Sequence, residues 1–345
     1  MDLITHVRKI LVVRLGAMGD IVHTLPAVAQ LKSKFPNAHV TWVIESKWKP
    51  LLDDNPDVDE VVTISLTQWR RYPGSLSTWS SFRAFCDRFR QSEFDVAIDF
   101  QGLLKSAAVT YISGAKRVVG FDRKVLRERT AALFYSDHVL PYSKHVVDQN
   151  RDLTMIVGAS KTPAIFSLPS GQCSPLLPDG EFVLTAPIAG WMSKQWPAKY
   201  YTELARLIWR DRRMPLVLDC APQDSAYVEQ ICVGAPKGSC IVHNSSLKEL
   251  IAATRQARAV VGVDSGPLHL AAALNVPGVA IYGPTDPVRN GPYGNSFHLM
   301  RSYETTTSYK RSEVVHPSML RVKPDQVWKA LKSVLDSHPV DKVRS

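Results

Sequence analysis

The order of apolar runs and helix-patterned segments constrains this 345-residue chain more than any other feature. The run Lys9–Leu15 (KILVVRL) is mostly apolar, as expected for a parallel strand buried on both faces. A tight turn over residues 16–20 and helical periodicity over residues 21–35 follow it. This order of strand and then helix recurs along the first half. It predicts an α/β fold with a parallel sheet covered by helices on both faces.

A proline-rich stretch interrupts the alternation between Thr162 and Gly180 and is typical of an interdomain linker. Beyond it the alternation restarts, beginning with a strand at Phe182–Ala186 and a helix at Ala198–Asp211. We therefore expect two doubly wound domains, 1–162 and 181–345, joined by a linker at 163–180. Ligands of such sheets bind beyond the carboxyl ends of the strands. Two facing domains would place the site in the cleft between them.

The charge of the chain indicates an anionic partner. Lys and Arg number 42 against 32 Asp and Glu, a net charge of +10. Nucleic acid, a phosphorylated substrate and an anionic lipid surface are all compatible with this excess, but no zinc-finger, RNP or basic-helix pattern supports nucleic acid. No apolar run is long enough to span a bilayer, and no signal peptide is recognisable, so we expect a cytoplasmic protein. Five cysteines without a C-x-x-C pair predict neither a disulfide framework nor a zinc site.

The first polar motif, Arg14-Leu-Gly-Ala-Met-Gly-Asp20, follows the first predicted strand. It matches neither the Walker A loop nor G-x-G-x-x-G. Gly16 and Gly19 allow a tight turn and close approach of the backbone to a ligand. Asp20 is then either the N-cap of the next helix or a carboxylate exposed at the end of the sheet.

The second motif, Val263-Asp-Ser-Gly-Pro-Leu-His269, begins at the end of a later buried strand. Pro267 favours the start of a helix there. Free N–H groups in its first turn would form an anion site; they belong to Ser265, Gly266, Leu268 and His269. Asp264 is placed to accept hydrogen bonds from sugar hydroxyls. A strand–helix junction without a ligand is the alternative.

Three further strand ends carry polar residues. Lys194, in Trp191-Met-Ser-Lys-Gln-Trp-Pro197, is either a phosphate-binding ammonium or a solvated lysine. Asp224 is placed either to bind a ribose or to cap a helix. The loop Tyr282-Gly-Pro-Thr-Asp-Pro287 is rigid in composition. In the first half, a set of basic residues suits phosphate or carboxylate binding, with a solvated face as the alternative; it comprises Arg70, Arg71, Lys105, Lys116, Arg117, Arg123, Lys124, Arg127 and Arg129.

Five segments in the same order resemble the bacterial lipopolysaccharide heptosyltransferases of glycosyltransferase family 9, especially the heptosyltransferase I branch. They are Gly16–Ala27, Asp99–Ala107, Arg127–Arg129, Asp264–His269 and Tyr282–Asp286. The resemblance implies a GT-B architecture, in which two Rossmann-like domains bind the acceptor (N-terminal) and the nucleotide sugar (C-terminal). It also implies an inverting transfer of heptose from ADP-heptose to the 3-deoxy-octulosonic acid (Kdo) region of the inner core on lipid A.

The resemblance implies roles for individual residues as well. Asp20 matches the general base and Lys194 a lysine on the donor diphosphate. The donor site is completed by Asp224, Asp264, Ser265, Gly266, Leu268 and His269. The acceptor site comprises Gly19, Arg70, Arg71, Gln101, Lys105 and Arg127. Two departures are Asp224, one methylene shorter than the family's glutamate, and Ser245, where a larger apolar residue faces adenine.

No cofactor and no catalytic metal are expected, although Asp57-Val-Asp59 matches the D-x-D tripeptide that holds a metal in some sugar-nucleotide enzymes. The expected partners are the ADP-sugar donor, the anionic Kdo-lipid A acceptor and, transiently, the inner leaflet, with no nucleic acid. A peripheral position at the inner face of the inner membrane follows, because anionic lipid attracts basic proteins. The alternatives are a GT-B-like sugar-nucleotide epimerase and a non-catalytic sugar-nucleotide-binding protein. An epimerase requires further acid–base groups, for which the sequence shows no obvious set.

Overall fold

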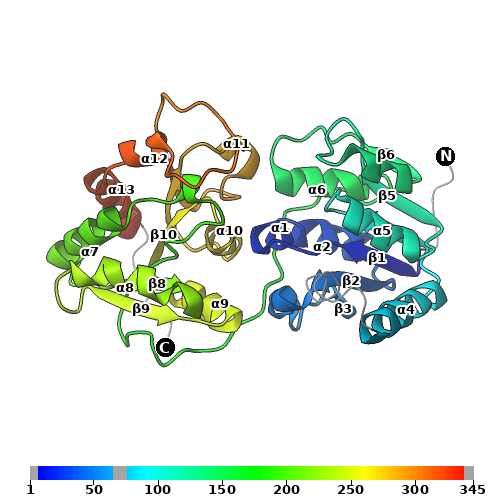
Figure 1. The fold of residues 1–345 in the computed structure, drawn as a ribbon, viewed down its shortest axis with the longest axis horizontal. Coiled ribbons are helices and arrows are strands. Elements are labelled where there is room, and N and C mark those ends of the chain that lie inside the picture. Colours follow the sequence, from blue (N-terminus) through cyan, green and yellow to red (C-terminus); the bar gives the residue numbers. More distant parts are fainter. Residues whose placement is uncertain (1–6, 65–75, 338–345) are drawn as a thin grey trace. The chain divides into compact units, whose positions relative to one another are not determined.

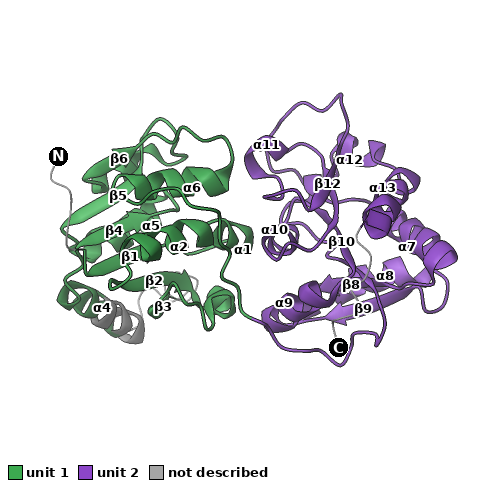
Figure 2. Cartoon of the chain, turned by 180° about the vertical axis from the view of Figure 1, so that it is seen from behind, with its two compact units in different colours: residues 1–169 green, residues 170–345 purple. Residues whose placement is uncertain are grey.

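The computed structural model describes residues 7–64 and 76–337. The chain divides into two compact units, Met1–Pro169 and Ser170–Ser345, which Figure 2 shows in different colours. Each unit contains a six-stranded sheet in which every pairing is parallel. The two doubly wound α/β sheets expected from the alternating pattern are therefore confirmed.

Unit 1 has the strand order β3-β2-β1-β4-β5-β6, so chain order reverses between β1 and β4 (Figure 1). Such a reversal opens a crevice at the carboxyl ends of the two strands, where ligands of α/β sheets bind. The elements are β1 (Lys9–Val13), α1 (Met18–Val22), α2 (Leu25–Lys34), β2 (His39–Glu45), the 3₁₀ helix η1 (Ser46–Leu52), β3 (Glu60–Ile64), α4 (Leu76–Gln91), β4 (Val96–Asp99), α5 (Leu104–Ile112), β5 (Arg117–Phe121), the 3₁₀ helix η2 (Arg129–Phe134), β6 (Asp137–Val139) and α6 (Val146–Met155).

Unit 2 repeats this topology with the order β12-β11-β10-β7-β8-β9, so its reversal lies between β7 and β10. The elements are β7 (Val183–Thr185), η3 (Met192–Lys194), α7 (Ala198–Arg212), β8 (Leu216–Cys220), η4 (Pro222–Asp224), α8 (Ser225–Val233), β9 (Cys240–Asn244), α9 (Leu247–Gln256), β10 (Ala259–Val263), α10 (Gly266–Ala273), β11 (Gly278–Tyr282), α11 (Pro287–Asn290), β12 (Phe297–Arg301), α12 (Pro317–Arg321) and α13 (Pro324–Ser337).

The single helix predicted over residues 21–35 is wrong in detail, because two helices occupy this region. α1 ends at Val22, and α2 begins at Leu25 with Thr24 as its N-cap. Pro26 lies in the first turn of α2, a position where its missing N–H costs nothing. Asp20 consequently lies on a separate five-residue helix, α1, which follows the end of β1 in the chain.

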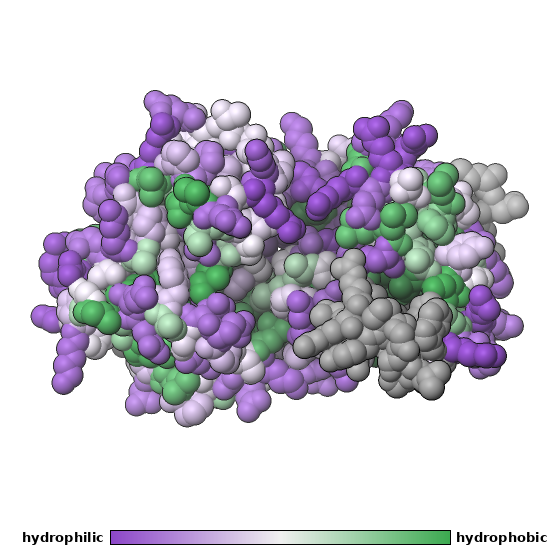
Figure 3. Space-filling model, in the orientation of Figure 1, coloured by the Kyte–Doolittle hydropathy of each residue, from purple (hydrophilic) through white to green (hydrophobic). Residues whose placement is uncertain are grey.

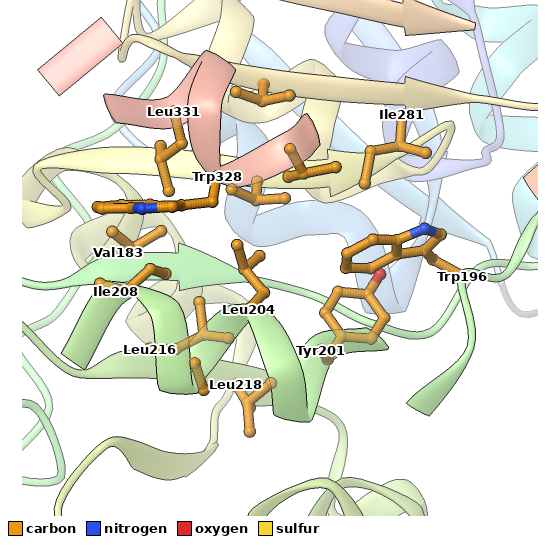
Figure 4. Packing of buried hydrophobic residues seen from close by; sticks show 14 of the residues in the cluster. Val183, Trp196, Tyr201, Leu204, Ile208, Leu216, Leu218, Ile281, Trp328 and Leu331 are labelled. Atoms are coloured by element: carbon orange, nitrogen blue, oxygen red, sulfur yellow. The ribbon is translucent and has the colours of Figure 1, made fainter. Parts of the chain in front are cut away.

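The core of unit 2 anchors the loop that carries Lys194. Trp196 is fully buried and stacks edge-to-face on Tyr201 of α7, with ring centroids 4.9 Å apart (Figure 4). Its indole N–H donates to the carbonyl of Val322 over 2.9 Å. The loop is therefore fixed at Trp196 by two interactions, the aromatic packing on α7 and the buried hydrogen bond to Val322.

Candidate active site

Asp20 is held in place by Arg14 at the carboxyl end of β1. Arg14 is buried, and its Nη2 lies 2.8 Å from Asp20 Oδ1, while its Nη1 donates to the carbonyl of Phe100 after β4. Asp20 Oδ2 accepts the N–H of Ala17 over 3.2 Å, so this residue caps α1 from within the first turn and not from the N-cap position. The carboxylate still remains 45% exposed. It is thus oriented by two donors and open to a ligand.

The loop after β4 is tied to the loop after β1. Gln101 Oε1 accepts the N–H of Leu15 over 2.9 Å. Below it, Asp99 is fully buried and accepts four hydrogen bonds; the donors are the N–H groups of Gln101 and Gly102 and the hydroxyls of Ser106 and Tyr135. Burial raises the pKa of Asp99 despite these four donors, whose effect is opposite. Asp99 therefore shapes the turn that presents Gln101.

The remaining acceptor candidates of unit 1 differ in position. Lys105 Nζ lies 3.6 Å from Glu45 Oε1, so the start of α5 meets the end of β2. Gly19 is buried in the first turn of α1. Arg127 is exposed and forms no ion pair within the part of the chain that the structure describes. Arg70 and Arg71 lie outside the described residues.

Lys194 and Asp264 come together in unit 2, at the reversal between β7 and β10. Lys194 Nζ lies 2.7 Å from Asp264 Oδ2, and His269 Nε2 lies 3.4 Å from Asp264 Oδ1. Burial alone raises the pKa of Asp264, but His269 and Lys194 outweigh it and hold the pKa well below its usual range. Asp264 is therefore an ionised, nearly buried carboxylate that Lys194 neutralises.

The first turn of α10 adjoins this ion pair. Gly266 and Leu268 lie where a helix leaves N–H groups without intrahelical partners. The expectation of a free N–H at His269 is wrong, because this group already donates to the carbonyl of Ser265 over 3.3 Å. The Ser265 hydroxyl is buried and, among residues 7–64 and 76–337, has no hydrogen-bond partner. A polar ligand at this position would supply one.

Two other buried hydroxyls at the same edge share this property. Ser193 precedes Lys194 after β7, and Thr285 follows β11 in the rigid loop noted in the sequence. Neither hydroxyl has a hydrogen-bond partner within the described ranges. Because β11, β10 and β7 are neighbours, the three unpartnered hydroxyls follow adjacent strands. Sequence reasoning missed Ser193 and did not single out Thr285 within its loop.

Arg311 is a further cation that the sequence did not reveal. Its Cζ lies 5.3 Å from the centroid of a Trp191 ring, and Lys194 Nζ lies 4.3 Å from the same residue's ring. The segment that carries Arg311 is tied to this edge of the sheet, because the N–H of His316 donates to the carbonyl of Ser193. Arg311 is exposed and has no carboxylate partner within the described residues. No local motif marks Arg311 as a site residue, because its position depends on a contact with Trp191, which lies more than a hundred residues away in the sequence.

Asp224 lies at the N-cap of α8, yet its side chain makes no capping hydrogen bond. It follows β8, the neighbour of β7, and the structure brings it into no hydrogen bond or ion pair with Lys194 or Asp264. Ser245 does not offer an apolar surface, because its hydroxyl donates to Asp219 over 2.6 Å. Asp219 also accepts from His243 over 2.9 Å, which leaves a polar cluster at the ends of β8 and β9.

The D-x-D pair is engaged in the structure of unit 1. Asp59 Oδ2 lies 2.7 Å from Lys32 Nζ and accepts the N–H of Val40, and Asp57 accepts from the hydroxyl of Ser167. Within residues 7–64 and 76–337, no three His, Cys, Asp or Glu side chains converge as metal ligands. No helix in these ranges combines the length and apolar character needed to cross a membrane.

Comparison with known proteins shows which family this chain is similar to. Residues 82–317 match the model of glycosyltransferase family 9 (heptosyltransferase). The chain is 29% identical to lipopolysaccharide heptosyltransferase 1 of Pseudomonas aeruginosa over 316 residues, which cover 90% of this chain and 88% of the relative. It is 30% identical to the Escherichia coli K12 protein of the same name over 302 residues, which cover 85% and 93%.

Solved structures agree with the sequence comparison. The E. coli heptosyltransferase WaaC with ADP is 25% identical, with a TM-score of 0.78 over 94% of this chain and 99% of that one. The E. coli ADP-heptose lipopolysaccharide heptosyltransferase II, at 22% identity and a TM-score of 0.77 over 95% and 99%, shares the fold. The sheets of this chain are thus those of the GT-B heptosyltransferases. With more than half of its length matching the family, the chain belongs to glycosyltransferase family 9 and is a glycosyltransferase.

Proposed function

We propose that this protein transfers heptose from ADP-heptose to the Kdo region of the lipopolysaccharide inner core, with inversion and without a catalytic metal. Relatives at 29–30% identity carry the name lipopolysaccharide heptosyltransferase 1. The similar WaaC structures are described with ADP and with ADP-2-deoxy-2-fluoro heptose. The observation that carries the proposal is the Lys194–Asp264 ion pair beside the first turn of α10, at the crevice of unit 2.

The donor would bind at this crevice through its diphosphate and sugar. On donor binding, the Lys194 ammonium would leave Asp264 and form an ion pair with a phosphate of the donor. The N–H groups of Gly266 and Leu268 would donate hydrogen bonds to the same phosphate. The hydroxyl of Ser265, which has no hydrogen-bond partner within the described residues, can donate a hydrogen bond to a phosphate or sugar oxygen. Asp264, relieved of Lys194, would accept from a sugar hydroxyl. Asp224, which caps nothing, is the carboxylate we assign to the ribose.

The charge at the donor site supports a reaction without a metal ion. Breaking the bond between heptose C1 and the diphosphate leaves negative charge on ADP, which the enzyme must stabilise. The charge of Lys194 is balanced by that of Asp264. The nearby guanidinium of Arg311 and the N-terminal turn of α10 would therefore supply the additional positive charge. These fixed donors would take the part that a metal ion has in other enzymes.

Asp20 would act as the general base. Its half-exposed carboxylate takes the proton of an acceptor hydroxyl, whose oxygen forms a bond to heptose C1 while ADP leaves with the electron pair of the broken bond. Arg14 would orient the carboxylate through the transfer. Gln101, Lys105 and Arg127 would bind the acceptor, whose Kdo carboxylates and lipid phosphates suit cationic and amide donors. We assign the protein to the inner face of the membrane, where such an acceptor is presented.

The test is a donor panel with purified Kdo-lipid A as acceptor. We expect ADP-heptose to yield a product heavier by one heptose, and UDP- and GDP-sugars to yield none. Nuclear magnetic resonance of the product should report an anomeric configuration opposite to that of the donor. Transfer from another nucleotide sugar, or retention of configuration, would overturn the proposal.

A further inference from the structure

Unit 1 exposes large apolar side chains beside unpaired cations on the surface formed by α5, the loop at residues 122–128 and η2. We name this surface the α5–η2 face. Its apolar members are Leu104, Tyr111, Val125 and Leu133, with 44%, 67%, 50% and 84% of their areas exposed. Its cations are Arg123, Lys124, Arg127 and Arg129, which are all exposed and form no ion pair within the described residues. Figure 3 shows apolar residues among hydrophilic ones over the region of α5.

Two contacts join these residues into one surface. At one end, the carboxylate of Glu128 accepts the N–H of Leu104 over 2.7 Å, which places the flanking Arg127 and Arg129 beside the start of α5. At the other end, the rings of Tyr111 and Phe134 pack edge-to-face with centroids 5.6 Å apart. The apolar and cationic residues are therefore not scattered over separate parts of the molecule.

The loop is built to present its outer side chains. Leu126 is buried, so its neighbours Val125 and Arg127 point away from the core, and Ala131 and Ala132 anchor η2 in the same way. The acidic residues of the segment are used internally: Glu128 accepts from Leu104, and Asp122 accepts the N–H of Lys124. Because a backbone N–H does not neutralise a carboxylate, residues 122–129 offer a partner four cations and two carboxylates, a net charge of +2.

We propose that the α5–η2 face binds the surface of an anionic lipid bilayer. Exposed apolar side chains flanked by cations form the composition that inserts into the headgroup boundary and attracts anionic headgroups. Exposing a large apolar side chain such as Leu133 to water is unfavourable, and apolar side chains that are exposed together beside polar ones mark an interaction site. The two together match a bilayer, which offers hydrocarbon beneath a layer of negative charge.

The position of the face gives it a role in the reaction. Leu104 directly precedes Lys105, and Arg127 is itself a member of the face, so the face adjoins one residue assigned to the acceptor and includes another. This part of the inference rests on the proposed function, because it requires an acceptor that is carried in a membrane. Docking by the α5–η2 face would hold the acceptor site against the layer of headgroups.

The experiment measures co-sedimentation of the full-length protein with vesicles of phosphatidylcholine, with and without phosphatidylglycerol, at low and high salt. Wild type should bind the vesicles that contain phosphatidylglycerol, and salt should weaken this binding. The double variant Val125→Ser/Leu133→Ser should weaken it at least tenfold. Arg123→Ala, Lys124→Ala and Arg129→Ala should each weaken it about fivefold, because one cation near an anionic surface contributes ~1 kcal/mol.

The matched control is Val233→Ser on unit 2, where Val233 is 87% exposed at the end of α8. It should bind as wild type does. Equal binding by wild type and Val125→Ser/Leu133→Ser would overturn the inference, as would binding that does not depend on phosphatidylglycerol. A dimer in solution that dissociates on Val125→Ser/Leu133→Ser would show instead that the face joins two copies of the chain.

Activity separates this inference from the proposed function. With a deacylated, water-soluble Kdo acceptor, Val125→Ser/Leu133→Ser should retain the wild-type rate, whereas transfer to acceptor embedded in vesicles should fall in step with the loss of binding. Failure of wild type on both acceptors would refute the heptosyltransferase proposal and leave the vesicle result standing. An equal loss of rate on both acceptors would refute the docking role.

Discussion

Replacing Lys194 with Met is a severe test of the donor site, because one atom, Nζ, neutralises Asp264 in the structure and is expected to bind the donor diphosphate. In the structure, Nζ neutralises Asp264, whose side chain is 5% exposed. Removing one partner of a buried ion pair costs about 3–5 kcal/mol. His269 also contacts Asp264, and Lys194 is 15% exposed, so we expect a smaller loss, about 2–3 kcal/mol. For a domain of this size, that corresponds to a fall in Tm of roughly 5–10 °C.

The same variant should weaken the binding of ADP. A hydrogen bond to a charged group contributes about 1.5–3 kcal/mol, which is roughly a 10- to 150-fold change in Kd. Calorimetric titration with ADP measures this change, with Lys199→Met as the control, since Lys199 is exposed on the adjacent helix α7. The double variant Lys194→Met/Asp264→Asn should recover much of the lost Tm but not the lost ADP affinity. An ADP Kd for Lys194→Met within twofold of wild type would refute the assignment.

The pH dependence of the Lys194→Met defect follows from the state of Asp264. Because the folded protein lowers the pKa of Asp264, ionisation of this group stabilises the fold above the unfolded pKa of about 4. This contribution is lost as the pH falls through the folded value. The difference in Tm between wild type and Lys194→Met should therefore be constant near neutrality and shrink below about pH 4. A difference that grows in acid would contradict the reasoning.

Three other predictions concern the neighbouring groups. Arg14→Met should lower kcat roughly 10- to 100-fold with ADP affinity unchanged, because Asp20 loses its orienting partner, and Arg14→Lys should recover part of the rate in steady-state assays. Arg311→Ala should raise the ADP Kd about fivefold by calorimetry, as expected for one exposed cation. Activity should survive excess EDTA; a loss that Mg²⁺ or Mn²⁺ restores would return attention to Asp57 and Asp59.

The predictable part of the fold was set by strong local patterns. Every central strand of the two sheets is a nearly continuous apolar run, and the strands predicted at Lys9–Leu15 and Phe182–Ala186 match β1 and β7 within two residues at either end. The strands that were missed, β6, β9 and β12, all lie at sheet edges, where one side faces solvent. Their sequences mix polar and apolar residues, as in Asp137–Val139 and Phe297–Arg301, so no buried-strand pattern marks them.

The candidate site divides in the same way. Motifs at strand ends marked Asp20, Lys194 and Asp264 as candidates, since doubly wound sheets bring such loops to one edge. The pairing of Lys194 with Asp264 was not predicted, because it depends on which strands become neighbours. Arg311 was missed for the same reason, and Arg14 was quoted in its motif without a role, because an arginine after a strand gives no sign of the carboxylate it will meet.

The assignment of Asp20 as the general base is tested most directly by the single-turnover rate of sugar transfer by Asp20→Asn, measured together with its affinity for ADP. We expect a folded protein that binds ADP as wild type does and transfers heptose about 10²- to 10⁴-fold more slowly, since asparagine has nearly the same shape and keeps one acceptor oxygen for Arg14 or Ala17 but cannot accept the proton. A rate within a few-fold of wild type would contradict this assignment and leave Asp20 as a helix cap that Arg14 happens to hold.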